Sequence, residues 1–377
     1  MIDGTNAYDP RWLADFPRLF DVIEPPGVFY PPAAGLVGLP FSLLSYGASR
    51  VAWFVTLVMS IVLGTRVMVR LASPASPSHT WLIASGLILV SACSRWGMTG
   101  LNAAGLVFGL LCWFVHALHR NQLHLAFALA LAAAALKVTL AVPFIGLLFL
   151  YRHHGIWLGV LAGAGLLNVL SFLRLGGRTA FNDFQANMAV LESLDNLNTP
   201  DPWSNFSVPR LDWTYLAFGL TGNLSVSNAL TLLLSAIVGL WLLATFLSPA
   251  REPTLERTTA ALLPLVCLSL LVVYHHHYDL LLILTPGLLA AFSPARPAGI
   301  RATKWLLVPV AVLVAALPVG VSHSLSTALF GASGTGYVNM LFPICTTLGL
   351  AGGLVLLSRV VGSPLTAAWN GAKGVGR

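Results

Sequence analysis

Charge is scarce in this sequence of 377 residues. Only 9% of the residues are Asp, Glu, Lys or Arg, whereas 57% are apolar. No acidic residue occurs between Glu24 and Asp183. Soluble globular domains carry about 25% charged residues, so this composition excludes an ordinary soluble domain.

Cysteine pairs and the common catalytic motifs are also missing. The four cysteines, Cys93, Cys112, Cys267 and Cys345, are widely spaced in apolar sequence, without metal-ligand or redox spacing. There is no HExxH motif, no nucleophile elbow and no phosphate-cradling glycine loop. We therefore expect core or lipid-facing thiols, no metal, no cofactor and no soluble-type nucleotide chemistry.

Long apolar runs are what the sequence does contain. Stretches near or above about 18 residues recur, which is the length needed to cross a hydrocarbon core. They predict an all-α, polytopic transmembrane bundle that forms one integral domain, residues 1–377. We place about 11 spans at residues 49–71, 80–95, 102–118, 123–137, 139–150, 156–173, 227–247, 259–274, 277–292, 305–322 and 337–358. Two of them, 123–137 and 139–150, are too short to cross alone, which predicts a shallow or broken hairpin.

Basic residues predict the orientation of the bundle. If residues 1–48 lie outside and the spans alternate, the inside loops hold 12 of the 20 basic residues and two of the 13 acids. This asymmetry is typical of a bacterial cell-membrane protein with its cytoplasmic side at those loops. The segment 1–48, with an interfacial or re-entrant stretch at 31–44, and the aromatic-rich loop 174–226 then face the non-cytoplasmic side.

Lys137 is the most unusual charge, because no other charged residue lies between Arg120 and Arg152. An ammonium near the membrane interior costs a few kcal/mol. Such a lysine faces an anionic partner or a cavity, or else its long side chain reaches the interface. Arg95 has the same two interpretations: a phosphate ligand or an interface arginine.

The stretch YHHHYD places His275, His276 and His277 between two tyrosines and before Asp279. Three adjacent rings on a helix point about 100° apart, so they do not converge on one metal ion. The stretch is either an aromatic anchor at the headgroup level or part of a site. A carboxylate at the start of an apolar run needs a partner, and Arg95, a tyrosine or a histidine could provide one. In the predicted topology Arg95, Asn102, Lys137 and these histidines all lie at the outer face.

Six segments together resemble glycosyltransferase family 87. They are NAYDP (6–10), FYPPAAGLVGLPFSLL (29–44), TGLNAAGLVFGLLCWF (99–114), LALAAAALKVTLAVPFIGLLFLYRHHGIW (129–157), NFSVPRL (205–211) and YHHHYDLLLILTP (274–286). Two motifs depart from the family pattern: the usual GQxN is GLN at Gly100 to Asn102, and the usual KP is Lys137–Val138.

The resemblance implies a GT-C-like membrane enzyme that moves mannose or arabinofuranose from a polyprenyl-phosphate carrier to an outer glycan or glycolipid. On this interpretation Lys137 and Arg95 bind the carrier phosphate. His276 and His277, rather than His275, act in the transfer step. The site would also include Asp9 and Asp279 as candidate bases and Tyr30, Asn102 and Tyr278 as lining residues.

The family's usual base lies after a leading span and before the YDP segment, and this sequence has neither. We therefore expect either an incomplete N-terminus or a catalytically inactive relative. The alternative function is a transporter or flippase for a lipid-linked or anionic solute. Transporters place their polar groups near the bilayer midplane, whereas here those groups gather at one face.

Overall fold

The structure is a computed structural model that describes residues 9, 31–99, 102–191, 199–203, 210–246, 253–272, 275–293 and 335–361. These residues are helical and contain no β-strand, which confirms the predicted all-α class. The elements are α2 (Ala34–Ser42), α3 (Tyr46–Ala72), α4 (Ser78–Val90), α5 (Ala92–Thr99), α6 (Ala104–His119), α7 (Leu123–Leu136), the 3₁₀ helix η1 (Val138–Ala141), α8 (Val142–Leu150), α9 (His154–Arg174), α10 (Arg178–Leu191), α11 (Trp213–Thr221), α12 (Leu224–Phe246), α13 (Leu255–Val272), the 3₁₀ helix η2 (His277–Ile283), α14 (Leu284–Phe292) and α17 (Thr335–Val361).

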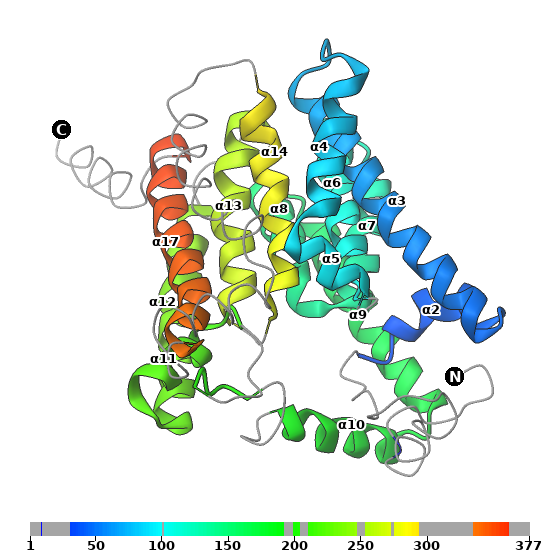
Figure 1. The fold of residues 1–377 in the computed structure, drawn as a ribbon, viewed down its shortest axis with the longest axis vertical. Coiled ribbons are helices and arrows are strands. Elements are labelled where there is room, and N and C mark those ends of the chain that lie inside the picture. Colours follow the sequence, from blue (N-terminus) through cyan, green and yellow to red (C-terminus); the bar gives the residue numbers. More distant parts are fainter. Residues whose placement is uncertain are drawn as a thin grey trace.

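Helix α13 forms the centre of the bundle. Every residue from Thr258 to Leu271 is buried, as expected for a helix that is apolar on all sides. It packs against α8, α14 and α17, and Figure 1 shows it between them. The residues at its C-terminal end are therefore held by several neighbouring helices.

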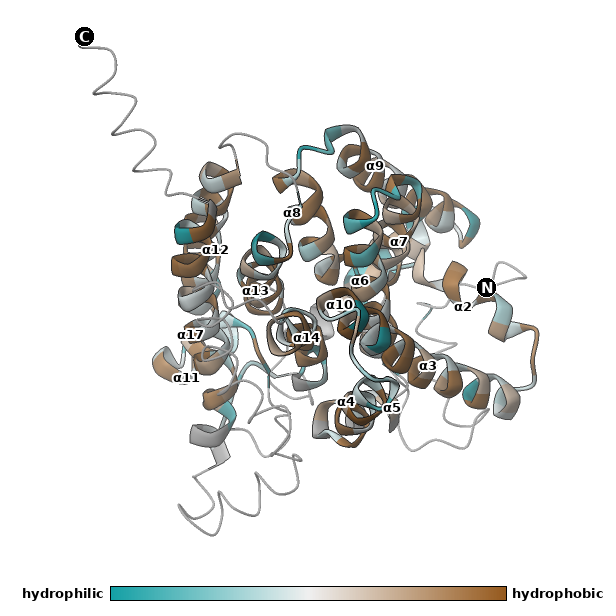
Figure 2. Cartoon of the chain, turned by 90° about the horizontal axis from the view of Figure 1, so that it is seen from above, coloured by the Kyte–Doolittle hydropathy of each residue, from teal (hydrophilic) through white to brown (hydrophobic). Residues whose placement is uncertain are grey.

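The outer surface of the bundle is apolar. Exposed leucines and isoleucines cover α4, α9 and α12, for example Ile83, Leu166 and Leu232, and Figure 2 shows the corresponding hydrophobic colouring of these helices. Five helices are long and apolar enough to cross a membrane: α3, α9, α12, α13 and residues 339–360 of α17. The protein is a membrane protein, and lipid tails are the natural neighbours of these side chains.

Each predicted span except 305–322, which lies outside the described residues, overlaps a helix. Five of these helices are shorter than a full crossing, so the count of about 11 spans stays a prediction. The predicted short hairpin is present as α7, with 14 residues, followed by η1 and α8. The span expected at 80–95 is interrupted, because Ser91 is extended and its hydroxyl accepts a hydrogen bond from Ser94 N–H at the start of α5.

Helix α10 occupies part of the loop predicted at 174–226 and lies across one end of the bundle (Figure 1). The turn before it contains Gly176 and Gly177, both with positive φ, which glycine adopts without steric cost. The ring of Phe172 on α9 contacts Phe181 and Phe184 on α10. These aromatic contacts hold α10 against the end of α9.

We predict that the α3–α6 contact tolerates no side chain at Gly109. A Cβ there would lie 2.8 Å from the carbonyl oxygen of Ser60, so Gly109→Ala should force the two helices apart and cost about 1–3 kcal/mol. Gly86→Ala on exposed α4 is the control, because nothing lies within 4 Å of its Cβ position. Thermal unfolding in detergent should show a lower midpoint for Gly109→Ala alone. Equal midpoints would contradict the close contact.

Candidate functional site

Lys137 lies at the turn of the short hairpin. The alanine-rich helix α7 ends at Leu136, and Lys137 is extended, with φ −154° and ψ 91°. Pro143 in the first turn of α8 favours the restart of the helix there. The break brings the lysine side chain to one end of the bundle, where 18% of it remains exposed.

His275 and His276 are not helical, which corrects the assumption of helical spacing through all three histidines. Helix α13 ends at Val272, His276 is extended and η2 begins at His277. Arg210 pairs with His276 in an isolated antiparallel bridge, and the N–H of Leu211 donates to the carbonyl of His275 at 2.9 Å. The two buried rings contact different groups: His275 bonds to Asp279, whereas His276 packs against Tyr278.

Lys137, His275 and Asp279 form one cluster, here called the Lys–Asp–His cluster. The Oδ2 atom of Asp279 accepts hydrogen bonds from Lys137 Nζ at 2.7 Å and from His275 Nδ1 at 2.8 Å. The side chains of His275 and Asp279 are fully buried. Among the described residues, Asp279 Oδ1 and His275 Nε2 have no hydrogen-bond partner. Lys137 is therefore the member of the cluster that a ligand can reach.

The pKa of His275, which lies between α13 and η2, is lowered from its ordinary value. Burial is the largest cause and the ammonium of Lys137 adds to it, while the carboxylate of Asp279 acts in the opposite direction. The ring is therefore neutral at pH 7, and Nδ1 carries the proton that it donates to Asp279. The cluster then contains one positive and one negative charge.

A second buried ion pair adjoins the cluster through the backbone. The guanidinium of Arg210 donates to both carboxylate oxygens of Asp212, at 2.9 and 3.0 Å. Asp212 also caps α11 by accepting from Tyr215 N–H at 3.1 Å. Because Arg210 and Leu211 bind His275 and His276 through the backbone, the ion pair anchors the histidine stretch.

Two other predicted residues, Tyr278 and His276, lie close to the cluster. The ring of Tyr278 is 5.8 Å from Lys137 Nζ and 5.2 Å from the ring of buried His276. Arg95 lies on α5, which packs against η2. The close approach of these elements is at Gly97, where a Cβ would lie 3.6 Å from Tyr278 Cβ.

Of the remaining predicted site residues, the structure describes Asn102 and Asp9. Asn102 is half-buried, accepts from Ala104 N–H and donates its own N–H to the carbonyl of Gly97. Asp9 is half-buried and its chain neighbours lie outside the described residues. Tyr30 also lies outside them, as do the side chains of Arg95 and His277.

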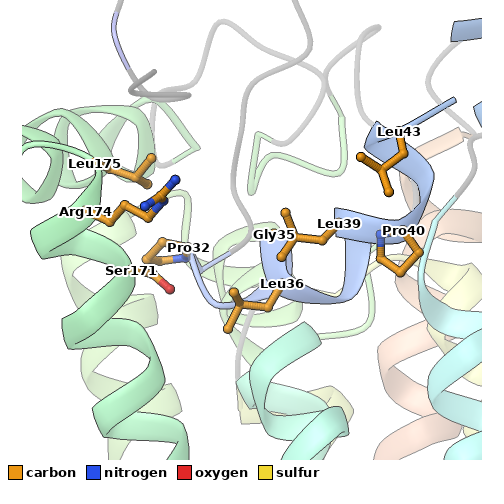
Figure 3. A pocket seen from close by; sticks show the side chains of 9 residues that line it. All are labelled: Pro32, Gly35, Leu36, Leu39, Pro40, Leu43, Ser171, Arg174 and Leu175. Atoms are coloured by element: carbon orange, nitrogen blue, oxygen red, sulfur yellow. The ribbon is translucent and has the colours of Figure 1, made fainter. Parts of the chain in front are cut away.

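A cavity of about 760 Å³ lies between α2 and the end of α9, away from the Lys–Asp–His cluster. Figure 3 shows its aliphatic lining, with Leu36, Leu39 and Leu43 from α2 and its following residue, and with Arg174 on the opposite wall. Helix α2 also packs against α7, the helix that ends at Lys137. The cavity has the size and apolar lining of a site for a hydrophobic ligand.

Sequence reasoning missed Arg210 and Asp212 as site residues and ranked His275 behind its neighbours. One signal was available: Arg210 and Asp212 are opposite charges two residues apart in an otherwise apolar segment. The preference for His276 and His277 over His275 came from the family resemblance and stays a prediction, whereas the structure adds His275 to the cluster through its bond to Asp279.

The fold and the cluster define a helical membrane protein with a buried charge network at one end of the bundle. The family model of glycosyltransferase family 87 matches residues 29–273, which is more than half of the chain. The chain therefore belongs to glycosyltransferase family 87, as the resemblance predicted, and membership indicates a glycosyltransferase. Neither the curated proteins nor the solved structures contain a match to it.

We predict that Asp212→Ala lowers the free energy of unfolding by about 3 kcal/mol or more, because the buried guanidinium of Arg210 loses its counter-ion and α11 loses its cap. The control is Asp201→Ala, which removes one carboxylate hydrogen bond to Trp203 N–H in an exposed turn and should cost about 1 kcal/mol. Thermal unfolding in detergent compares the two variants. Similar midpoints would show that the Arg210–Asp212 pair does not anchor the fold.

Proposed function

We propose that the protein transfers a sugar of the mannose or arabinofuranose type from a polyprenyl-phosphate carrier to a glycan or glycolipid. The reaction takes place at the non-cytoplasmic face of a bacterial membrane, on a GT-C-like bundle. The partners are the carrier lipid, the acceptor and the surrounding membrane lipids, and no metal or cofactor takes part. Family membership supports the transferase class.

The observation that carries the proposal is the partly exposed ammonium of Lys137, fixed by a buried carboxylate at one end of an apolar bundle. In the transfer step the acceptor hydroxyl attacks the anomeric carbon, and the bond from that carbon to the phosphate oxygen breaks. Polyprenyl phosphate leaves with the electron pair, and the hydroxyl proton passes to a base. A fixed cation at the phosphate stabilises the charge that develops on the leaving oxygen.

The buried position of Asp279 argues against a role as the base, since its carboxylate is fully buried and bound to both Lys137 and His275. Half-buried Asp9 is the remaining sequence candidate. Arg95 provides a second cation from α5, and His276 and His277 orient the acceptor or the phosphate. Tyr30, Asn102 and Tyr278 line the acceptor side.

The apolar cavity beside α2 supports a lipid-linked donor. A polyprenyl chain is long and apolar, so it can reach an apolar cavity that lies apart from the phosphate site, and α2 packs on the helix that ends before Lys137. The alternative, transport of a lipid-linked or anionic solute, requires that polar groups be accessible near the middle of the membrane. The clustering of the predicted groups at one end favours transfer, and an inactive relative would bind the carrier without transferring its sugar.

We predict that Lys137→Met lowers sugar transfer by about two orders of magnitude or more, because the leaving phosphate loses its fixed cation. Lys137→Arg should retain part of the activity, since the charge remains. The assay measures transfer of labelled sugar from polyprenyl-phosphate sugar by membranes that contain the full chain. Arg50→Met is the matched control, because Arg50 is an exposed cation in the first turns of α3, where its guanidinium lies 5.6 Å from the centre of the Tyr46 ring. If folded Lys137→Met keeps nearly full transfer, Lys137 does not bind the phosphate and is only an interfacial side chain.

We also predict which end of the bundle faces outward. The turn between α11 and α12 and the turn between α3 and α4 lie at opposite ends of the bundle (Figure 1). Exposed Asn223 lies in the first turn and exposed Ala75 in the second, and each is replaced by a single cysteine. With the four native cysteines replaced by serine, a membrane-impermeant maleimide should label the Asn223 position in intact cells and the Ala75 position only after lysis. The opposite labelling pattern would reverse the orientation and move the site to the cytoplasmic face.

A further inference from the structure

Asp279 presents a chemical conflict that the proposed function leaves open. A site for an anionic phosphate should be positive, yet Asp279 places a full negative charge 2.7 Å from the ammonium that would bind the phosphate. The carboxylate is fully buried, so water does not screen it strongly. It therefore weakens the attraction of Lys137 for any second anion.

The geometry of the ammonium leaves room for such an anion. Lys137 has three N–H donors, and one of them donates to Asp279 Oδ2. The exposed part of the side chain can direct the other two to a phosphate, whereas Asp279 itself is closed to ligands. A phosphate at Lys137 would share the ammonium with Asp279 rather than displace the buried carboxylate.

His275 strengthens this arrangement from the other side. Its Nδ1–H donates to the same oxygen, Oδ2, and its peptide carbonyl is bound by Leu211 N–H. The Leu211 bond holds the backbone of His275, and the buried ring, bound to Oδ2, fixes the orientation of the carboxylate. Because the ring is neutral, it adds a hydrogen bond without adding positive charge to the phosphate site.

We propose that Asp279, oriented by His275, is a positioning residue with two effects on the transfer reaction. It holds the Lys137 ammonium at one place beside the leaving group, and its negative charge limits the affinity for the polyprenyl phosphate product, so that the product dissociates. This inference rests on the proposed phosphate role of Lys137.

The test compares Asp279→Asn with the wild type in the full-length protein. The amide is nearly isosteric, and its oxygen at the Oδ2 position can accept from both Lys137 Nζ and His275 Nδ1, as the carboxylate oxygen does. The probe is farnesyl phosphate, a short polyprenyl monophosphate, titrated into detergent-solubilised protein. Loss of the negative charge should tighten its Kd about tenfold, or about 1.4 kcal/mol, while kcat for sugar transfer falls about tenfold or more and the KM for the donor does not rise.

Asp279→Glu separates position from charge. It keeps the negative charge but moves the carboxylate by one methylene, so the Kd for farnesyl phosphate should stay within about twofold of wild type while kcat falls. Asp201→Asn, which removes a carboxylate from a turn at residues 199–203, should change neither value. If Asp279→Asn does not fold, an unchanged kcat in Asp279→Glu overturns the positioning role and a reduced kcat at wild-type Kd supports it.

Lys137→Met separates this inference from the proposed function. If Lys137→Met binds farnesyl phosphate as tightly as wild type, the phosphate role of Lys137 is wrong, and the inference fails with it. If Lys137→Met binds weakly but folded Asp279→Asn binds no more tightly than wild type, the phosphate site stands and the counter-charge role is overturned. A purely structural role for Asp279 would lower the unfolding midpoint and weaken binding and transfer together.

Discussion

The cost of placing charge in an apolar bundle governs this structure. An ammonium or a carboxylate buried alone would be strongly unfavourable, and the ion pair between Lys137 and Asp279 reduces that cost for both. The pair also joins elements far apart in sequence, because Lys137 follows α7 and Asp279 lies in η2. Any rearrangement that separates the two elements must expose or isolate both charges.

Several helix ends meet at this ion pair. Helix α7 stops at the lysine, α13 stops before the histidine stretch, and Arg210 and Leu211 bind that stretch through the backbone. The buried fork between Arg210 and Asp212 fixes this segment. Helix α13, apolar on every side, holds the assembly in the centre of the bundle. The charged end of the protein therefore depends on the packing of a long, uncharged stretch.

Apolar run length predicted most of the helices, because helices are the only open-chain structures that satisfy the backbone in lipid. The same reasoning located Lys137 at a hairpin turn and Asp279 near a histidine, since an isolated charge needs a partner. It did not predict the extended backbone at His276, because that conformation depends on pairing with Arg210, which is 66 positions away. The interruption at Ser91 was also not predicted. A serine that ends one helix and caps the next cannot be distinguished in sequence from a serine inside a span.

The short hairpin has a consequence for the bilayer itself. Helix α7 has 14 residues, or about 21 Å at 1.5 Å per residue, against a hydrocarbon core of about 30 Å. If the other end of α7 lies at the opposite interface, Lys137 lies several ångströms below the headgroup level. Under the proposed function, the carrier phosphate would then meet it only where the membrane is thinned or the phosphate is drawn inward. Because the hairpin is shorter than the hydrocarbon core, the thickness of the bilayer would affect the depth at which a lipid phosphate can reach the Lys137 ammonium.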